Sequence, residues 1–322
     1  MRIAVLIGGR SSEHEISLQS GASVANGLRE AGHEVVPVLL ERDGRWTHEG
    51  EEVPLRAGGG LLGVDVVFPV LHGPFGEDGT VQGLLECLDV PYAGPGVLAA
   101  ALSIDKLTFK RLLAFHGIPQ VDFCEAGEEG WREHVAAMGI PVWVKPARLG
   151  SSVGITKVTS PERPLEEAID AARGYDPRVI IEANGGGREV ECSVMGNDDP
   201  VTSPPGEIVA HADWYDFEAK YSEGGMDLIV PARIGDDAIA RVRELAARVF
   251  RAIDGSGLAR CDFFVRDDGE VLVNELNTIP GFTATSVFAK LFEADGIPYP
   301  ELCDRLVQYG LERYEAQRRY RF

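Results

Sequence analysis

The feature that most constrains the fold is an alternation of apolar runs with a helical pattern near the N-terminus. Residues 2–8, 35–40 and 64–71 are short, mainly apolar runs. Between the first two, residues 17–31 have the spacing of a helix that ends at a glycine. Such alternation is typical of a parallel sheet covered by helices. The sequence therefore predicts a Rossmann-like βαβ unit at the N-terminus.

Two further α/β units are expected after this one. The chain has 322 residues, of which 44% are hydrophobic, enough for more than one core. The turn-rich residues 91–96 and the glycine run at 185–187 are candidate joints, and a long helix is predicted over 97–115. We therefore expect units at residues 1–96, 97–183 and 184–322.

Charge and cysteine content limit the partners. There are 31 Lys and Arg against 51 Asp and Glu, giving a net charge of -20, which disfavours nucleic acid as a partner. No apolar stretch reaches the length of a membrane span, and the first apolar run is too short for a signal peptide. The five cysteines are scattered without CxxC spacing, as expected for reduced thiols in the cytoplasm.

A β-hairpin is predicted around Asp268-Gly269, which lies between two apolar runs. A two-residue turn at this dipeptide would pair Asp262 with Glu275, and Arg260 with Asn277. Residues two apart on a strand share a face, so these four side chains would project together. A three-residue turn would shift the register and separate the facing pair.

The facing carboxylates predict a metal site. Asp262 and Glu275 would repel each other unless a cation lay between them. Together with the amide oxygen of Asn277 they suit magnesium carried in with a polyphosphate. The alternative is a solvated polar face on which Arg260 forms a salt bridge.

An anion site is predicted beside Lys145, because a lysine in an apolar strand is unfavourable unless it meets an anion. The loop from Gly150 to Gly154 places Ser151 and Ser152 between glycines, so its N–H and O–H groups can surround phosphate oxygens. A plain turn explains the loop almost as well. Lys106 suits the same anion if its helix packs over the sheet. The chain has no GxxxxGK[ST] motif and no well-placed dinucleotide fingerprint.

Acidic and histidine side chains follow the first and third predicted strands. Ligands of open α/β sheets bind beyond the carboxyl ends of the strands. Glu13 is therefore a candidate for holding a substrate ammonium, and His72 lies in the matching loop. Helix capping by Ser11 or Ser12 is an equally good explanation of the first loop.

Other candidates lie further along the chain. Glu182 ends a strand and Glu189 follows the glycine run, so either could accept from a purine amino group or a ribose hydroxyl, although solvated loop carboxylates explain them as well. The polar-aromatic residues 215–221 are expected to close over a site. Gly281 and Ser286 offer an N–H and a hydroxyl to an oxyanion or carboxylate.

These motifs, in this order, resemble D-alanine–D-alanine ligases of the ATP-grasp superfamily over nearly the whole chain. The resemblance rests on GGRSSEHEIS at 8–17, LHGPFGEDG at 71–79, DK at 105–106, KPARLGSSVG at 145–154, YDFEAKY at 215–221, RCD at 260–262 and NELNTIPG at 274–281. Some family members carry lysine and a bulky apolar residue where this chain has Ala183 and Asn184. A lysine contact with ATP at that point is therefore excluded.

The resemblance implies a three-domain ATP-grasp fold with ATP held between the central and C-terminal domains. The implied activity joins two D-alanine molecules through an acyl phosphate, for peptidoglycan precursor synthesis. ATP and two magnesium ions would be required, with manganese as a substitute and a monovalent cation as an open addition. A cytoplasmic homodimer is implied.

The resemblance also implies roles for individual residues. ATP would be contacted by Lys106, Lys145, Ser151, Ser152, Glu182, Glu189 and Lys220, and the metals by Asp262, Glu275 and Asn277. Glu13, with His72 nearby, would bind the first D-alanine and form a hydrogen-bonded set with Ser151 and Tyr221. Arg260 and Gly281 would form the oxyanion site, and Ser286 and Lys220 would contact the second D-alanine's carboxylate and the γ-phosphate.

Several alternatives stay open. A D-alanine–D-lactate ligase is one, although such enzymes typically replace the loop tyrosine that is present here as Tyr221. Another ATP-grasp carboxylate–amine ligase is a second. A non-catalytic nucleotide-binding module is disfavoured by the three metal-type residues together, and a nicotinamide dehydrogenase by the missing fingerprint.

Overall fold

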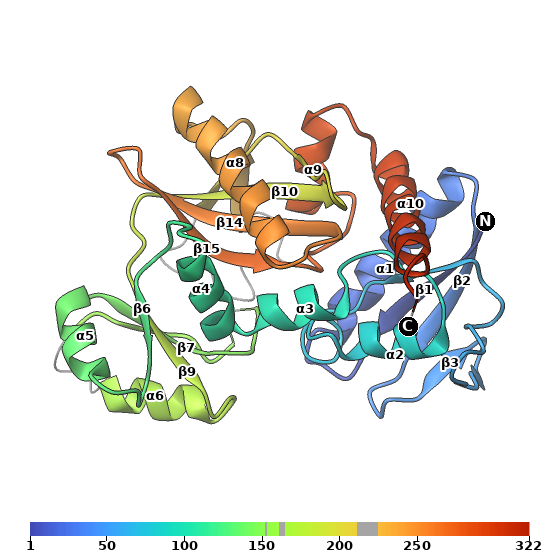
Figure 1. Ribbon diagram of the computed structural model, residues 1–322, viewed down its shortest axis with the longest axis horizontal. Helices are drawn as coiled ribbons and strands as arrows, with labels where there is room; N and C mark the ends of the chain where they lie inside the picture. Colours follow the sequence, from blue (N-terminus) through green and yellow to red (C-terminus); the bar gives the residue numbers. More distant parts are fainter. Residues whose placement is uncertain (152, 161–164, 211–224, 322) are drawn as a thin grey trace.

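The computed structural model describes residues 1–151, 153–160, 165–210 and 225–321. Its strands form three sheets that follow one another along the chain (Figure 1). Helices cover the sheets, so the predicted α/β class is confirmed. No helix in the described part of the chain is both long enough and apolar enough to cross a bilayer.

The N-terminal sheet is parallel at its centre, as predicted. Its order is β4-β3-β2-β1-β5, and β1 pairs in parallel with both β2 and β5. Two short antiparallel strands, which were not predicted, extend one edge. The elements are β1 (Arg2–Gly8), α1 (His14–Glu30), β2 (Glu34–Leu40), β3 (Trp46–His48), β4 (Glu51–Glu52), β5 (Val66–Pro69) and α2 (Thr80–Leu88).

The predicted helix over 97–115 is two helices, α3 (Val97–Ile104) and α4 (Lys106–Phe115). The break lies at Asp105, whose backbone is extended and whose carboxylate caps α4 by accepting from the N–H of Thr108 at 2.9 Å. Arg178 donates to the same carboxylate at 2.8 Å. The break makes Lys106 the first residue of α4, so its side chain lies at the helix N-terminus.

The central sheet is antiparallel, with the order β6-β9-β7-β8. Its elements are β6 (Phe123–Glu125), α5 (Trp131–Met138), β7 (Val142–Pro146), β8 (Thr156–Val158), α6 (Leu165–Arg173) and β9 (Val179–Ala183). Side chains of α5 and α6 cover one face through a core that includes Trp131 and Ile169. The opposite face carries Lys145 and Glu182, on neighbouring strands.

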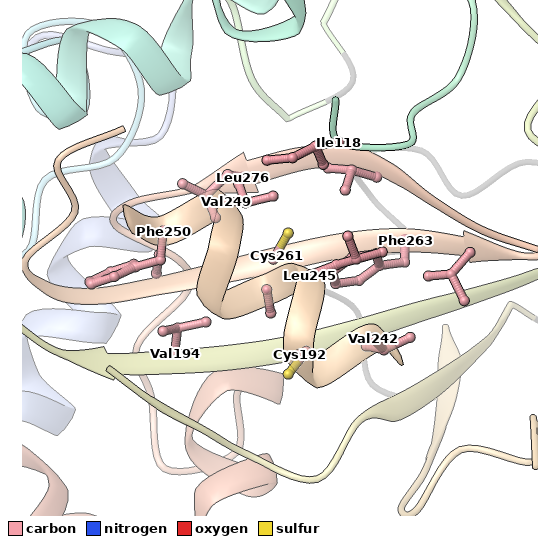
Figure 2. Packing of buried hydrophobic residues seen from close by; sticks show 14 of the residues in the cluster. Ile118, Cys192, Val194, Val242, Leu245, Val249, Phe250, Cys261, Phe263 and Leu276 are labelled. Carbon is pink, nitrogen blue, oxygen red and sulfur yellow. The ribbon is translucent and has the colours of Figure 1, made fainter. Parts of the chain in front are cut away.

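The C-terminal sheet has the order β13-β12-β10-β14-β15, with β11 beside β10. Its elements are β10 (Arg188–Gly196), β11 (Val201–Thr202), β12 (Gly206–Ala210), β13 (Met226–Ile229), α8 (Asp236–Ala252), β14 (Gly257–Val265) and β15 (Val271–Asn277). Figure 2 shows α8 packed against one face, with Leu245 and Val249 over Cys261 and Phe263. Burial alternates along β14, so Asp262 projects from the opposite face.

The predicted two-residue hairpin turn is wrong, but the facing pair that it implied is present. Arg266 pairs with Glu270 through backbone hydrogen bonding, which leaves a three-residue turn with Gly269 at φ 88°. A register shift follows at Asp262/Phe263, because Asn274 is an extra residue in β15. This bulge cancels the shift of the longer turn. Asp262 therefore faces Glu275, and both side chains leave the core.

The C-terminal helices complete the core of the N-terminal sheet. The elements are α9 (Val287–Ala294) and α10 (Tyr299–Gln317). Phe288, Leu302 and Leu306 are fully buried in one cluster with Ile3 and Val5 of β1. Figure 1 shows α10 against the N-terminal unit, beside α1. The domain boundaries at 96/97 and 183/184 remain a prediction.

Candidate active site

A cleft of about 680 Å³ lies between the central and C-terminal sheets. Strands β7 and β9 line one side, and β10, β12, β14 and β15 line the other. Its volume is in the range of small-molecule binding sites.

The side formed by the central sheet and α4 carries a group that we call the lysine wall: Lys106, Lys110 and Lys145 around Glu182. Lys110 Nζ lies 3.0 Å from Glu182 Oε1, and Lys145 Nζ lies 2.5 Å from Glu182 Oε2. Glu182 is 3% exposed and Lys110 is 1% exposed. The anion that was predicted beside Lys145 is therefore, in part, the carboxylate of Glu182.

The lysine wall holds Glu182 ionised. Burial alone would raise the pKa of Glu182, but Lys110 and Lys145 outweigh burial and lower the pKa to about 2. Burial also lowers the pKa of Lys106 and Lys110. For Lys145, the carboxylates of Glu182 and Glu275 outweigh burial and raise the pKa. Among these three lysines, the charged form is therefore favoured most at Lys145, which lines the cleft.

The predicted phosphate loop joins β7 to β8. Lys106 Nζ donates to the carbonyl oxygen of Leu149 at 2.6 Å, which ties α4 to the loop. Arg148 holds the start of the loop through a two-pronged contact with Asp176, at 2.9 and 2.7 Å. Ser151 has φ 53°, in the left-handed region, and its hydroxyl leaves the loop toward the N-terminal unit.

The opposite side of the cleft carries the carboxylate wall: Glu191, Asp262 and Glu275 around Arg260. Arg260 donates to both oxygens of Asp262 at 2.7 Å and lies 2.9 Å from Glu191 Oε2. Asn277 donates to Asp262 Oδ2 at 3.0 Å. In the described part of the chain, no three His, Cys, Asp or Glu side chains form a metal-type cluster. The predicted set differs from such a cluster, since it has two carboxylates and an amide.

The N-terminal loops meet the cleft at Ser151, whose hydroxyl donates to the carboxylate of Glu13. This is the Glu13–Ser151 hydrogen bond that the resemblance implied. Glu13 occupies the N-cap position of α1, and no side chain caps that helix. Ser11 instead donates to the carbonyl oxygen of His72 at 2.6 Å, joining the two loops. The capping explanation of the first loop is therefore wrong.

His72 is buried beside two carboxylates. Its Nδ1 lies 3.6 Å from Glu77 Oε1, and its Nε2 lies 3.3 Å from Ser20 Oγ. Burial alone would lower the pKa of His72, but Glu77 and Glu13 outweigh it and raise the pKa. A protonated imidazole would balance these carboxylates in the interior.

The connection from β9 to β10 brings Glu182 and Glu189 to the same cleft. Its glycines allow close packing against β14. A Cβ on Gly185 would collide with the Phe264 ring, and one on Gly187 with the carbonyl oxygen of Val265. Gly187 also has φ 74°. The predicted joint is therefore packed against the hairpin.

Gly281 and Ser286 lie together at the start of α9. A Cβ on Gly281 would lie 3.4 Å from Ser286 Oγ. Ser286 is the N-cap residue, and its hydroxyl accepts from the N–H of Thr283 at 3.0 Å. This end of a helix favours negative charge.

Three predicted residues, Ser152, Lys220 and Tyr221, lie outside the described residues. Two residues of the site were missed, Lys110 and Glu191. A signal for Lys110 existed: it follows Lys106 by four residues, so both share one helix face. Glu191 follows Glu189 by two on one strand, which likewise gives both residues the same face.

Two family models match the chain. The one described as "D-ala D-ala ligase N-terminus" matches residues 2–58 and 53–95, and the one described as "D-ala D-ala ligase C-terminus" matches residues 112–308. Together they cover most of both sides of the cleft.

Similar proteins and solved structures indicate the same family as the two family models. The D-alanine–D-alanine ligase of Deinococcus radiodurans is 48% identical over 97% of this chain and 98% of its own. The solved D-alanine–D-alanine ligase of Coxiella burnetii is 33% identical, with a TM-score of 0.88 over 99% of this chain and 96% of that one. The VanG D-Ala:D-Ser ligase of Enterococcus faecalis is 32% identical, with a TM-score of 0.85 over 96% of this chain and 99% of that one. On these matches, the chain belongs to the D-alanine–D-alanine ligase family and has its ATP-grasp fold.

Proposed function

We propose that this protein uses ATP to join two D-alanine molecules into D-alanyl-D-alanine, a step in peptidoglycan precursor synthesis. The observation that carries the proposal is the hydrogen bond from Ser151 to Glu13. It joins a lysine-lined cleft, suited to a polyphosphate, to a carboxylate that suits an amino acid's ammonium. A ligase that activates an amino acid with ATP requires these two sites side by side.

The chemistry explains why both sites are needed. A carboxylate is a poor acyl donor at neutral pH. Its oxygen attacks the γ-phosphorus of ATP, ADP leaves, and an acyl phosphate forms. The amine of the second D-alanine then attacks the acyl carbon, phosphate leaves, and the nitrogen loses a proton. Protein groups contribute mainly by positioning and by stabilising charge.

On the nucleotide side, Lys106 and Lys145 would hold phosphate oxygens, helped by the loop at Ser151 and Ser152. Glu182 and Glu189 would accept from the adenine amino group and the ribose. Two facts support these roles: the lysines line the cleft, and both carboxylates line it at the two ends of one connection.

The donor set of the carboxylate wall fits magnesium. Asp262 and Glu275 lie at facing positions, and Asn277 adds an amide oxygen, so the donors are all oxygen and two are ionised. These three residues would hold two magnesium ions, with manganese as a substitute. When bound, the ions supply positive charge to the phosphoryl oxygens. A requirement for a monovalent cation stays open, and it can be tested by adding such a cation to the activity assay.

On the amino-acid side, Glu13 would hold the ammonium of the first D-alanine, with His72 close to it. Arg260 and the Gly281 N–H would stabilise the oxyanion, while Ser286 and Lys220 would bind the second D-alanine's carboxylate and the γ-phosphate. Tyr221 would join the Glu13–Ser151 pair when residues 215–221 close over the site. Closure would keep water from the acyl phosphate.

The second substrate is the point on which relatives differ, since one solved relative is titled a D-Ala:D-Ser ligase. We propose D-alanine because the curated relatives with 39–48% identity are named for it. The test measures ADP release with D-alanine, L-alanine, D-serine and D-lactate, with mass detection of the product. ADP release that depends on D-alanine, with D-alanyl-D-alanine as the main product, is expected. A larger yield of D-Ala-D-Ser or of the depsipeptide would overturn the choice of second substrate.

We also propose a cytoplasmic homodimer with domains at 1–96, 97–183 and 184–322. The five cysteines support a reducing compartment, since each is a free thiol. The homodimer rests on the family resemblance alone. Sedimentation analysis at micromolar concentration tests it, and a monomer would contradict it.

A further inference from the structure

Lys110 is a buried charged residue for which the reaction, as described above, has no use. It lies one helical turn after Lys106 on the buried face of α4. Its exposed fraction is 1%, and its Nζ lies 5.8 Å from the centre of the Phe123 ring. It does not line the cleft, whereas Lys106, Lys145 and Glu182 do. Lys110 is therefore placed to act on the cleft only through a neighbour.

That neighbour is Glu182. Each oxygen of its carboxylate takes one lysine, Lys110 on Oε1 and Lys145 on Oε2. With both lysines protonated, the three groups carry a net charge of one positive unit. The other charges that act on them are Lys106 and the carboxylates of Glu275 and Glu189. Lys110 and Lys145 thus supply one more positive charge than the carboxylate of Glu182 balances.

We propose that Lys110 is the permanent counter-ion of Glu182, and that it leaves Lys145 able to transfer from Glu182 to a nucleotide phosphate. The proposal rests on the proposed function, because it takes a nucleoside triphosphate as the ligand of the cleft. Lys110 is then a positioning residue, because it acts on the nucleotide only through Glu182 and Lys145.

The reason lies in the energetics of buried ion pairs. Removing one partner of such a pair is strongly unfavourable, because it leaves a buried charge without compensation. If Lys145 were the only partner of Glu182, its transfer to a phosphate would leave the carboxylate alone in the interior. With Lys110 in place, Glu182 keeps one cation throughout. The incoming phosphate then supplies the negative charge that the group lacks.

The experiment measures ATP affinity by calorimetry, together with KM for ATP, KM for D-alanine and kcat. Lys110→Met removes the charge and keeps an unbranched side chain that is one atom shorter. We expect a rise of about tenfold in Kd and KM for ATP, with kcat and KM for D-alanine within about twofold of wild type. Lys290→Met is the matched control, because Lys290 is exposed on α9. It should change none of these values. Unchanged ATP affinity in folded Lys110→Met would overturn the proposal.

A second pair of variants separates positioning from packing. If Lys110 acts by balancing Glu182, it becomes unnecessary once residue 182 is neutral. Adding Lys110→Met to Glu182→Gln should therefore leave KM for ATP within about twofold of Glu182→Gln alone. A further rise of tenfold on adding Lys110→Met would overturn the proposal. This comparison holds even if Lys110→Met alone does not fold, because it sets the double variant against Glu182→Gln, and Lys145 loses the carboxylate of Glu182 in both.

Failure of the proposed function can be distinguished from failure of the Lys110 proposal. Calorimetry of ATP binding requires no turnover, so it tests Lys110 whichever amino acids the enzyme joins. If wild type binds ATP but makes no D-alanyl-D-alanine, the proposed reaction is wrong and the Lys110 measurement still stands. If wild type does not bind ATP, both proposals are wrong.

Discussion

Each side of the cleft carries a group of charged side chains in contact with one another, and the two groups have opposite net charge. In the lysine wall, one carboxylate, Glu182, is shared by two lysines. In the carboxylate wall, one guanidinium, Arg260, is shared by Asp262 and Glu191. Each group keeps a net charge, because the lysine wall has three lysines around one carboxylate and the carboxylate wall has three carboxylates around one guanidinium. The opposite signs fit the proposed ligands, with the anionic phosphates on the lysine side and a cation on the carboxylate side.

The largest loss of activity is expected when charge is removed from the carboxylate wall. Glu275→Gln keeps the shape of the side chain but removes a metal-type donor that faces Asp262. We expect turnover to fall on the order of 1,000-fold, with the melting temperature little changed. The measurement is ADP release at saturating magnesium.

Glu270→Gln is the matched control for that prediction. Glu270 belongs to the same hairpin, but it is exposed and pairs with Arg266 at the turn. Its turnover should equal that of wild type. Normal activity of Glu275→Gln at ordinary magnesium would remove the metal assignment.

The stability that the lysine wall contributes should depend on pH. Because the folded pKa of Glu182 is about 2, below the ordinary 4.5, its ion pairs stabilise the fold fully above pH 4.5. That contribution, up to about 3 kcal/mol, is lost as the pH falls from 4.5 toward 2. Urea unfolding at pH 6, 5, 4 and 3 should show a steeper loss in wild type than in Lys110→Met/Glu182→Gln.

Glu207 serves as an internal reference for the pH test. Its pKa is also about 2, because Arg233 and Arg188 donate to it, and it is unchanged in the double variant. The difference between the two proteins therefore isolates Glu182. Parallel pH profiles would show that Glu182 contributes no such stability.

The third test asks whether the excess positive charge serves the nucleotide. Lys145→Ala should weaken ATP binding by roughly 30-fold, about 2 kcal/mol, because a charge-assisted contact with phosphate is lost. Titration calorimetry with ATP and magnesium gives the Kd, and Lys290→Ala is the control. An unchanged Kd for both Lys145→Ala and Lys106→Ala would exclude the phosphate role.

The smallest expected effect concerns a residue that belongs to neither wall. Tyr221→Phe removes one hydroxyl, and we expect the amide-forming step to slow by about tenfold, the usual effect of losing one buried hydrogen bond. D-lactate brings no ammonium, so its use as second substrate should fall less. Competition between D-alanine and D-lactate from pH 6 to 9 measures the ratio. A constant product ratio would leave Tyr221 as a packing residue.

Much of the fold was predictable because it follows from local patterns. The strand at 2–8 matches β1 to the residue, since a continuous apolar run is its own signal. The break at Asp105 was missed although part of its signal is local: Asp105 caps α4 by accepting from the N–H of Thr108. The contact from Arg178, far along the chain, carries no such local signal. For Asp262 and Glu275 the prediction was right for an incomplete reason: the turn is longer than expected, and the bulge at Asn274 restores the register.

The site was predictable where a residue type conflicted with its surroundings. Lys145 conflicted with an apolar strand, so it indicated an anion. Lys110 showed no such conflict, because a lysine on a helix is usually exposed. Its spacing from Lys106 places both on one helix face, but only the packing of α4 buries that face. Its partner Glu182 lies 72 residues away, beyond any local pattern.

The packing of α9 and α10 onto β1 and β5 has a consequence for the order in which the protein is made. A ribosome completes the N-terminal sheet early and releases the helices that cover one of its faces at the very end. Until residues 287–307 emerge, Ile3, Val5 and Phe68 lack the aromatic and leucine side chains that bury them. A chain that stops before residue 287 therefore carries an open apolar face on its earliest part, a typical cause of aggregation and degradation. One apolar face of the first sheet is therefore covered only after residues 287–307 have been made.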